Sequence, residues 1–237
     1  MDVVYICREG ENEELRYSIR SVVENMPHDK IWVVGGKPSW YKGNHIEVRQ
    51  FKTKLANARA NMDAIVASEE ISDDFILMND DFFIMEPIEY PEYYYTGTLA
   101  KKIEYFRKKH PRSVYTKLLM RSYKTIKHKG IQVPLDYTLH VPMIMNKEKL
   151  KDILPLAISW RIAYGNIYNV GGIEVIADGS PTKDVKIYVE NNELTSVDHN
   201  PLSKTYLSTE DRAFERMKDF FQEKFPTPSP YEKKPRA

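Results

Sequence analysis

The chain has 237 residues, of which 42% are apolar and 12% aromatic, enough for a sizeable core in one large domain. Its net charge is +1, and its single cysteine, Cys7, excludes an internal disulfide and fits a reducing compartment. There is no run of 18 apolar residues and no basic signal region at the N-terminus, so we expect a soluble cytoplasmic protein.

The first third of the chain alternates between predicted strands and helices. Connections too long for hairpins predict a parallel β-α-β arrangement. Neither a Gly-x-Gly-x-x-Gly motif nor a Walker lysine loop is present, which argues against dinucleotide and P-loop sites. We predict a nucleotide-binding type of α/β unit with strands at 2–7, 30–36 and 45–49 and helices at 12–23 and 55–68.

The stretch Asp74–Met85 combines a strand pattern with adjacent carboxylates. An apolar run, Phe75 to Met78, leads through Asn79 into Asp80 and Asp81, and a second apolar run follows. Two neighbouring carboxylates would not share a core without a partner or a cation. Ligands bind at the carboxyl ends of strands in open α/β sheets, so this pattern predicts a metal or phosphate-handling site. The alternative is a solvated turn between two strands.

Residues 87–130 combine a tyrosine-rich loop with a strongly basic segment. The tyrosines of 87–95 would either stack on a sugar or base or cover the site. Residues 101–129 hold eleven Lys or Arg and one acid, Glu104, a local charge of +10 that leaves −9 elsewhere. Two helical pieces split by Pro111 are expected, with the cations on a solvated face or in contact with a polyanion. The candidate contact residues are Lys108, Lys109, Arg112, Arg121 and Lys124.

The second half contains a strand-like run at 136–145 and a candidate helix at 159–166. His140 lies within the strand-like run, and from spacing alone such a histidine is more often a core residue than a catalyst. A loop is expected at 178–184, a polar turn at 198–201 and an extended proline-rich tail from 226. The last helix is expected to start near 207–214, with Ser208 or Thr209 as its cap.

Several blocks of the sequence resemble the stealth family of sugar-phosphate transferases, which build capsular polysaccharides and tag lysosomal glycoproteins. The second block of that family is similar to 12–21, 31–35, 38–40 and 75–83. Residues 139–147 resemble the third block, and 207–211 weakly resemble the fourth. The turn Ile6–Gly10 departs from the first block, and the family's long insertions are absent. The chain thus looks like the short relatives in bacteriophage genomes that are described as glycosyltransferases, which would place it in the host cytoplasm.

The resemblance implies a GT-A-like (Rossmann-like) α/β fold with a mostly parallel central sheet flanked by helices and a basic helical insertion. Residues 1–237 would form one transferase domain. Its parts would be a nucleotide-sugar-binding half at 1–86, the tyrosine-rich and basic segment at 87–130, an acceptor and catalytic half at 131–225, and the tail at 226–237.

The resemblance also implies roles for individual residues. Asp80 and Asp81 would hold Mn²⁺ or Mg²⁺ against the diphosphate of a nucleotide-sugar donor, a UDP-sugar in the first instance. His140 would act as general base or as nucleophile, with Asp211 as the backup base. The catalytic set is then His140, Asp81 and Asp211, and the donor-binding set is Arg16, Asn79, Asp80 and Arg161.

Different activities fit these features. A sugar or a sugar phosphate could be transferred, and a hydrolase could use the same metal site on phosphate esters. A non-catalytic nucleic-acid-binding protein could use the basic segment alone. A hybrid would glycosylate a hydroxylated base in phage DNA. Nothing in the sequence indicates an oligomeric state.

Overall fold

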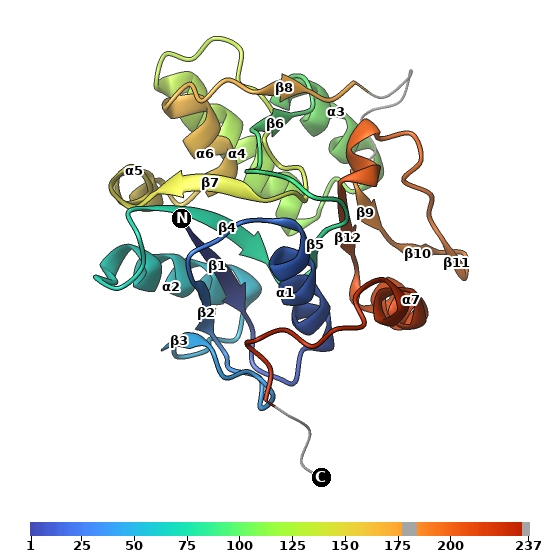
Figure 1. The fold of residues 1–237 in the computed structure, drawn as a ribbon. Helices are drawn as coiled ribbons and strands as arrows, with labels where there is room; N and C mark the ends of the chain where they lie inside the picture. Colours follow the sequence, from blue (N-terminus) through green and yellow to red (C-terminus); the bar gives the residue numbers. More distant parts are fainter. Residues whose placement is uncertain (177–183, 234–237) are drawn as a thin grey trace.

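A computed structural model describes residues 1–176 and 184–233 and contains a central five-stranded sheet in the order β3-β2-β1-β4-β7 (Figure 1). Four of these strands run parallel and β7 is antiparallel to β4. The structure therefore confirms an α/β fold with a mostly parallel central sheet flanked by helices. The strands are β1 (Asp2–Cys7), β2 (Ile31–Gly35), β3 (Asn44–Glu47), β4 (Asp74–Asn79) and β7 (Met143–Asn146).

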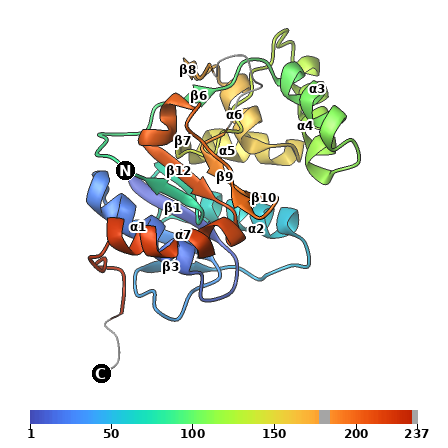
Figure 2. The ribbon, with the colours of Figure 1, turned by 90° about the vertical axis from the view of Figure 1, so that its right-hand side faces the viewer.

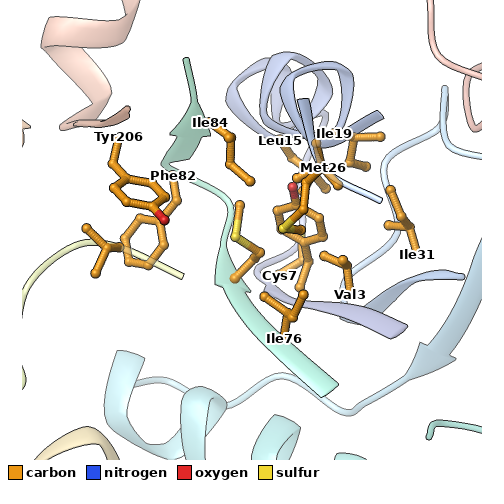
Figure 3. Close-up of a cluster of buried hydrophobic side chains, with 14 of the residues drawn as sticks. Val3, Cys7, Leu15, Ile19, Met26, Ile31, Ile76, Phe82, Ile84 and Tyr206 are labelled. Atoms are coloured by element: carbon orange, nitrogen blue, oxygen red, sulfur yellow. The ribbon is translucent and has the colours of Figure 1, made fainter. Parts of the chain in front are cut away.

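Helices cover both faces of this sheet because its buried strands alternate between two apolar clusters. In β1, Val3 and Tyr5 face one cluster and Val4 the other. The first cluster includes Leu15 and Ile19 of α1, which lie above the sheet in Figure 3. Helix α1 spans Glu13–Asn25. The opposite face is covered by α2 (Lys54–Ala67), α4 (Val114–His128), α5 (Lys147–Ile153) and α6 (Trp160–Ile167).

A smaller three-stranded sheet, in the order β5-β12-β9, lies beside the main one. Its strands are β5 (Phe82–Ile84), β12 (Tyr206–Thr209) and β9 (Lys186–Ile187). The last helix, α7 (Asp211–Lys224), packs on it, with the Phe221 ring stacked 4.1 Å from the Phe83 ring. Since β5 follows β4 after two residues, the turn between them joins the two sheets.

The basic segment forms two helices, α3 (Leu99–Lys109) and α4, which Figure 2 shows side by side at one edge of the molecule. As predicted, Pro111 lies between them, and Ser113 caps α4. Among the described residues, no helix is long and apolar enough to cross a membrane. The remaining elements are β6 (Tyr94–Tyr95), β8 (Ile173–Glu174), β10 (Val189–Glu190), β11 (Glu193–Leu194) and the 3₁₀ turns Leu154–Leu156 and Pro201–Lys204.

The final described stretch, 226–233, lies against α1 and is not extended throughout, because it turns at 229–232, where the Glu232 amide donates to the Ser229 carbonyl at 3.1 Å. Arg20 of α1 donates to both carboxylate oxygens of Glu232, at 2.8 and 2.7 Å. Tyr231 stacks on Tyr41 with ring centroids 6.4 Å apart. These contacts hold the C-terminal segment against the helix whose first turn borders the site described below.

Two sequence predictions were wrong. Ser208 and Thr209 do not cap the last helix: both are buried in β12, where Ser208 pairs with Phe82, and Glu210 occupies the cap position. The strand predicted at 136–145 is confined to β7, because Pro142 cannot donate to a ladder and the preceding residues turn away from the sheet. Of the loop predicted at 178–184, only Asp184 lies inside the described residues.

Asp2 joins the amino ends of three strands, which makes it a test of the fold. Its carboxylate accepts from Trp32 Nε1 at 2.9 Å, from the Ser72 amide at 3.1 Å and from the Lys30 amide at 3.2 Å. Asp2→Ala leaves these donors without an acceptor, so we expect the free energy of unfolding to fall by about 2–4 kcal/mol. Urea unfolding measures this, and the exposed control Glu69→Ala should stay within about 0.5 kcal/mol of wild type.

Candidate active site

The carboxyl ends of β1 and β4 form the edge at which the candidate site is built. From β1 the chain continues to β2 on one side, whereas β4 lies on the other side of β1. Connections that leave adjacent parallel strands in opposite directions open a crevice at their carboxyl ends, where ligands bind in such sheets. Asp80 and Asp81 follow β4 directly, and the loop Arg8–Asn12 follows β1.

Asn12 links the two strand ends. Its side-chain oxygen accepts from the Leu15 amide at 3.0 Å and caps α1, while its Nδ2 donates to Asp80 Oδ2 at 2.7 Å. The residue has φ 39°, a left-handed conformation that asparagine tolerates better than most residues. Burial, and then the neighbouring Asp81, raise the pKa of Asp80 to about 6. Asn12 thus holds the Asp80 carboxyl group in place, and the pKa of this group is close to neutral pH.

One carboxylate oxygen of Asp81 has partners and the other has none among the described residues. Its Oδ2 forms an ion pair with Lys186 of β9 and accepts from Ser208 Oγ at 3.3 Å. Its Oδ1 is buried and has no hydrogen-bond partner among the described residues. Burial lowers the pKa of Lys186, but the charge and hydrogen bond of Asp81, together with the smaller effects of Tyr188 and Glu14, outweigh burial and raise it. A buried carboxylate oxygen without a donor is rare in folded proteins, and it fits a cation or a ligand donor at this point.

Glu14 lies close enough to Asp80 and Asp81 for their charges to act on it. It is 6% exposed and accepts a hydrogen bond from Thr209 Oγ1. Burial is the largest cause that raises its pKa, to about 8, and the charges of Asp81 and Asp80 add to it. At neutral pH Glu14 is therefore mostly protonated, which lets three carboxyl groups lie close together with less repulsion.

Arg161 of α6 brings a buried positive charge to the same place. Its Nη1 donates to the Val141 carbonyl at 2.8 Å, and its guanidinium lies 5.3 Å from the centroid of the Phe82 ring. Burial lowers its pKa to about 10, while Asp184 and Asp81 oppose that shift, so it stays charged at neutral pH. Its Nη2 is buried and finds no hydrogen-bond acceptor within the described part of the chain. This donor is available to an anionic ligand.

His140 and Asp184 form a hydrogen-bonded dyad. The His140 Nδ1 and Asp184 Oδ2 atoms are 2.5 Å apart, and the His140 backbone amide donates to Asp184 Oδ1 at 3.0 Å. Burial opposes the charge of Asp184, but His140 outweighs that effect and brings the pKa of Asp184 down to about 2. An ionised Asp184 can only accept a hydrogen bond, so Nδ1 carries the proton of this bond, and in a neutral imidazole the lone pair is then on Nε2. Asp184 precedes β9 by two residues, so the short segment 184–187 contacts both His140 and Asp81.

The structure brings together four of the predicted site residues, Asp80, Asp81, His140 and Arg161, through shared partners and charges. His140 is not a core residue of a strand, since it is 29% exposed and paired with Asp184.

The other predicted residues have different surroundings, although the charge of Asp211 acts on Glu14 and Asn79 directly precedes Asp80. Arg16 pairs with Glu13 at 2.9 Å and stacks over Trp40. Asp211 is exposed and pairs with Arg8 at 3.0 Å. Asn79 ends β4 beside Ile6. Among the tyrosines of the 87–95 loop, Tyr93 donates to the Ile144 carbonyl at 3.0 Å. The proposed roles of these residues remain predictions.

Sequence reasoning missed Glu14, Asp184 and Lys186. The only sequence signal at Glu14 is an acidic residue in the first turn of a helix, which is common in solvated helices. The pair Asp184-x-Lys186, two opposite charges two residues apart, was the available signal for a segment that contacts the site. It was hidden because β9 is only two residues long. Within residues 1–176 and 184–233, no group of three or more His, Cys, Asp or Glu side chains could hold a metal ion by itself.

No family model matches the sequence, and no curated protein does so either. Two crystal structures of the glycosyltransferase GlyE from Streptococcus pneumoniae TIGR4 are similar to this chain at 11% sequence identity. One has a TM-score of 0.33 and covers 64% of this chain and 35% of that chain. The apo form has a TM-score of 0.28, with coverages of 73% and 64%. The chain thus spans less than two thirds of either GlyE chain, and we base the function proposed below on the side chains of the site.

Glu14 gives the site a stability signature that depends on pH. The folded pKa of about 8 lies above the ordinary value of 4.5, so between these values the folded state binds more protons than the unfolded state. Stability should therefore fall as pH rises from about 5 to 8. Glu14→Gln removes this dependence, and we expect the variant to have the higher melting temperature at pH 8. Thermal unfolding at pH 5 and pH 8 measures the difference, and equal pH slopes for variant and wild type would contradict the buried, protonated Glu14.

Proposed function

We propose that the protein is a nucleotide-sugar-dependent glycosyltransferase of GT-A-like architecture, with the donor diphosphate bound at Asp80 and Asp81. The observation that carries this proposal is the buried, unpartnered Oδ1 of Asp81 at the carboxyl end of β4. The unpartnered Nη2 of Arg161 supplies a matching donor for an anion. An acceptor and a cationic donor, each without a partner among the described residues, suit a ligand that brings both a metal ion and phosphate oxygens.

The oxygen ligands fit a hard divalent cation, Mn²⁺ or Mg²⁺. Such ions are commonly held by one or two carboxylates, with substrate phosphates and water completing the shell. Asp81 Oδ1 and the carboxylate of Asp80 would provide the protein ligands, which agrees with the absence of a larger ligand group among the described residues. When bound, the cation would supply positive charge to the departing diphosphate.

Arg161 and Lys186 would bind the diphosphate directly. Arg161 carries a guanidinium donor without a partner, and Lys186 already lies on Asp81. Both are held at partly buried positions, where a charged hydrogen bond is stronger than in water. Their charges would stabilise the negative charge that develops as the bond to the sugar breaks.

His140 would act as general base on the acceptor. Its Nε2 takes the proton of an acceptor hydroxyl as that oxygen bonds to the anomeric carbon of the sugar. The bond between the anomeric carbon and the diphosphate oxygen breaks, and the nucleoside diphosphate leaves with the electron pair. Asp184 stabilises the imidazolium that results. In sugar-phosphate transfer the acceptor would instead attack phosphorus, and a nucleoside monophosphate would leave, so the released nucleotide distinguishes the two reactions.

Donor binding tests the proposal most directly. We expect UDP or another nucleoside diphosphate to raise the melting temperature in the presence of Mn²⁺, by an amount equivalent to about 2.7 kcal/mol at 100 times its dissociation constant. Asp81→Asn should lose most of this stabilisation, because Oδ1 no longer carries negative charge. The exposed control Asp219→Asn should keep it. Absence of a shift with every nucleotide in folded wild-type protein would contradict a donor site.

The dyad offers a second test. Asp184→Asn places an amide against His140 Nδ1, which favours the tautomer with its proton on Nε2 and removes the proton acceptor. We expect a fall in kcat of about 10²–10⁴-fold, with little change in donor affinity. Imidazole ¹⁵N NMR would show the change of tautomer without any substrate. A normal tautomer in the variant, or unchanged turnover, would remove His140 from the role of base.

A further inference from the structure

The helix α4 carries a stripe of exposed positive charge. Its buried side chains, Thr116, Leu119, Ser122 and Ile126, pack towards the protein. Spacings of four and three residues place a second set on the opposite face, where each member is exposed: Lys117, Arg121, Lys124 and His128. Arg112, in the turn between α3 and α4, is exposed as well. We call Arg112, Lys117, Arg121 and Lys124 the α4 stripe.

The stripe differs from Lys102 and Lys108 of α3, which have acidic partners. On α3, Lys108 pairs with Glu104 at 2.8 Å, and Lys102 pairs with the buried Asp136 at 3.1 Å. Over residues 1–176 and 184–233, no stripe residue forms an ion pair or a side-chain hydrogen bond. Four cations gathered without acids create a local positive field, although the whole chain is almost neutral.

The hairpin of α3 and α4 is joined to the segment that carries His140. Tyr115, in the first turn of α4, donates to Thr138 Oγ1 at 3.1 Å. Thr138 in turn donates to Asp136, the partner of Lys102. The helix that carries the stripe is therefore tied to the 136–140 segment, at whose end the dyad lies.

We propose that the α4 stripe binds the phosphate backbone of a single-stranded nucleic acid. The helical rise of about 1.5 Å per residue sets successive stripe cations on α4 about 4.5–6 Å apart, close enough for each to meet a phosphate of an extended strand. His128 is exposed on the same face as the stripe, four residues after Lys124, and offers an aromatic ring to a base. An acidic protein would match the charge but would leave this ring without a stacking partner. That the nucleic acid is the acceptor rests on the proposed glycosyl transfer, whereas its binding to the α4 stripe does not.

The test uses fluorescence anisotropy of a labelled 20-nucleotide oligonucleotide with the full chain at several salt concentrations. The variant Lys117→Gln/Arg121→Gln/Lys124→Gln removes three stripe charges. The matched control, Lys42→Gln/Lys204→Gln/Lys224→Gln, removes three exposed charges elsewhere. We expect the stripe variant to bind at least 10-fold more weakly at low salt, and its slope of log K against log salt to fall by about 2. The control should keep the wild-type slope.

Other outcomes would overturn the proposal. These are no binding of the oligonucleotide by wild type at low salt, an equal loss in both triple variants, or equally strong competition by polyglutamate. Asp81→Asn separates the two proposals, because it should abolish the donor-induced thermal shift and leave oligonucleotide binding unchanged. If nucleotides do not raise the melting temperature of the wild-type protein but the oligonucleotide still binds, the glycosyltransferase proposal is refuted and the nucleic-acid surface is retained.

Discussion

The ion pair between Asp81 and Lys186 joins the main sheet to the small one, and the rest of the site depends on it. Asp81 lies in the turn that leaves the main sheet, and Lys186 lies in β9 of the small sheet. Neither charge could stay buried alone, because an unpaired ion in a protein interior is strongly unfavourable. Their pairing fixes the position of β9, and β9 in turn fixes Asp184 against His140.

Most of the fold was predictable from local pattern, because the strands of the main sheet are buried runs and α1 has its own apolar spacing and cap. The wrong predictions arose where residues distant in sequence decide the structure. Ser208 and Thr209 look like helix caps locally, but pairing with β5 and contact with Glu14 place them in a strand. Asp80 and Asp81 were found because their contrast with apolar neighbours is local. Asp184 and Lys186 were missed because their partners lie 44 and 105 residues away.

The molecule keeps its charges in two different states. In the site, Glu14, Asp81, Arg161 and Lys186 are buried or nearly so, and burial and the charge of Asp81 shift the pKa values of the other three. On the outer face of α4 the cations are solvated and unpaired, so salt screens them and they interact at longer range. The first arrangement suits precise contacts with a small ligand, and the second suits a long, flexible anion.

The position of β12 has a consequence for how the protein is made. Strand β5 emerges early in synthesis but pairs with β12, which follows about 120 residues later in the chain. The main parallel strands, by contrast, are available once the first eighty or so residues have left the ribosome. Because the chain is synthesised from its N-terminus, contacts between the first strands can form before those with β12. The nascent chain therefore carries Asp81 without Lys186 and Ser208, and the site closes only when the last quarter of the chain arrives.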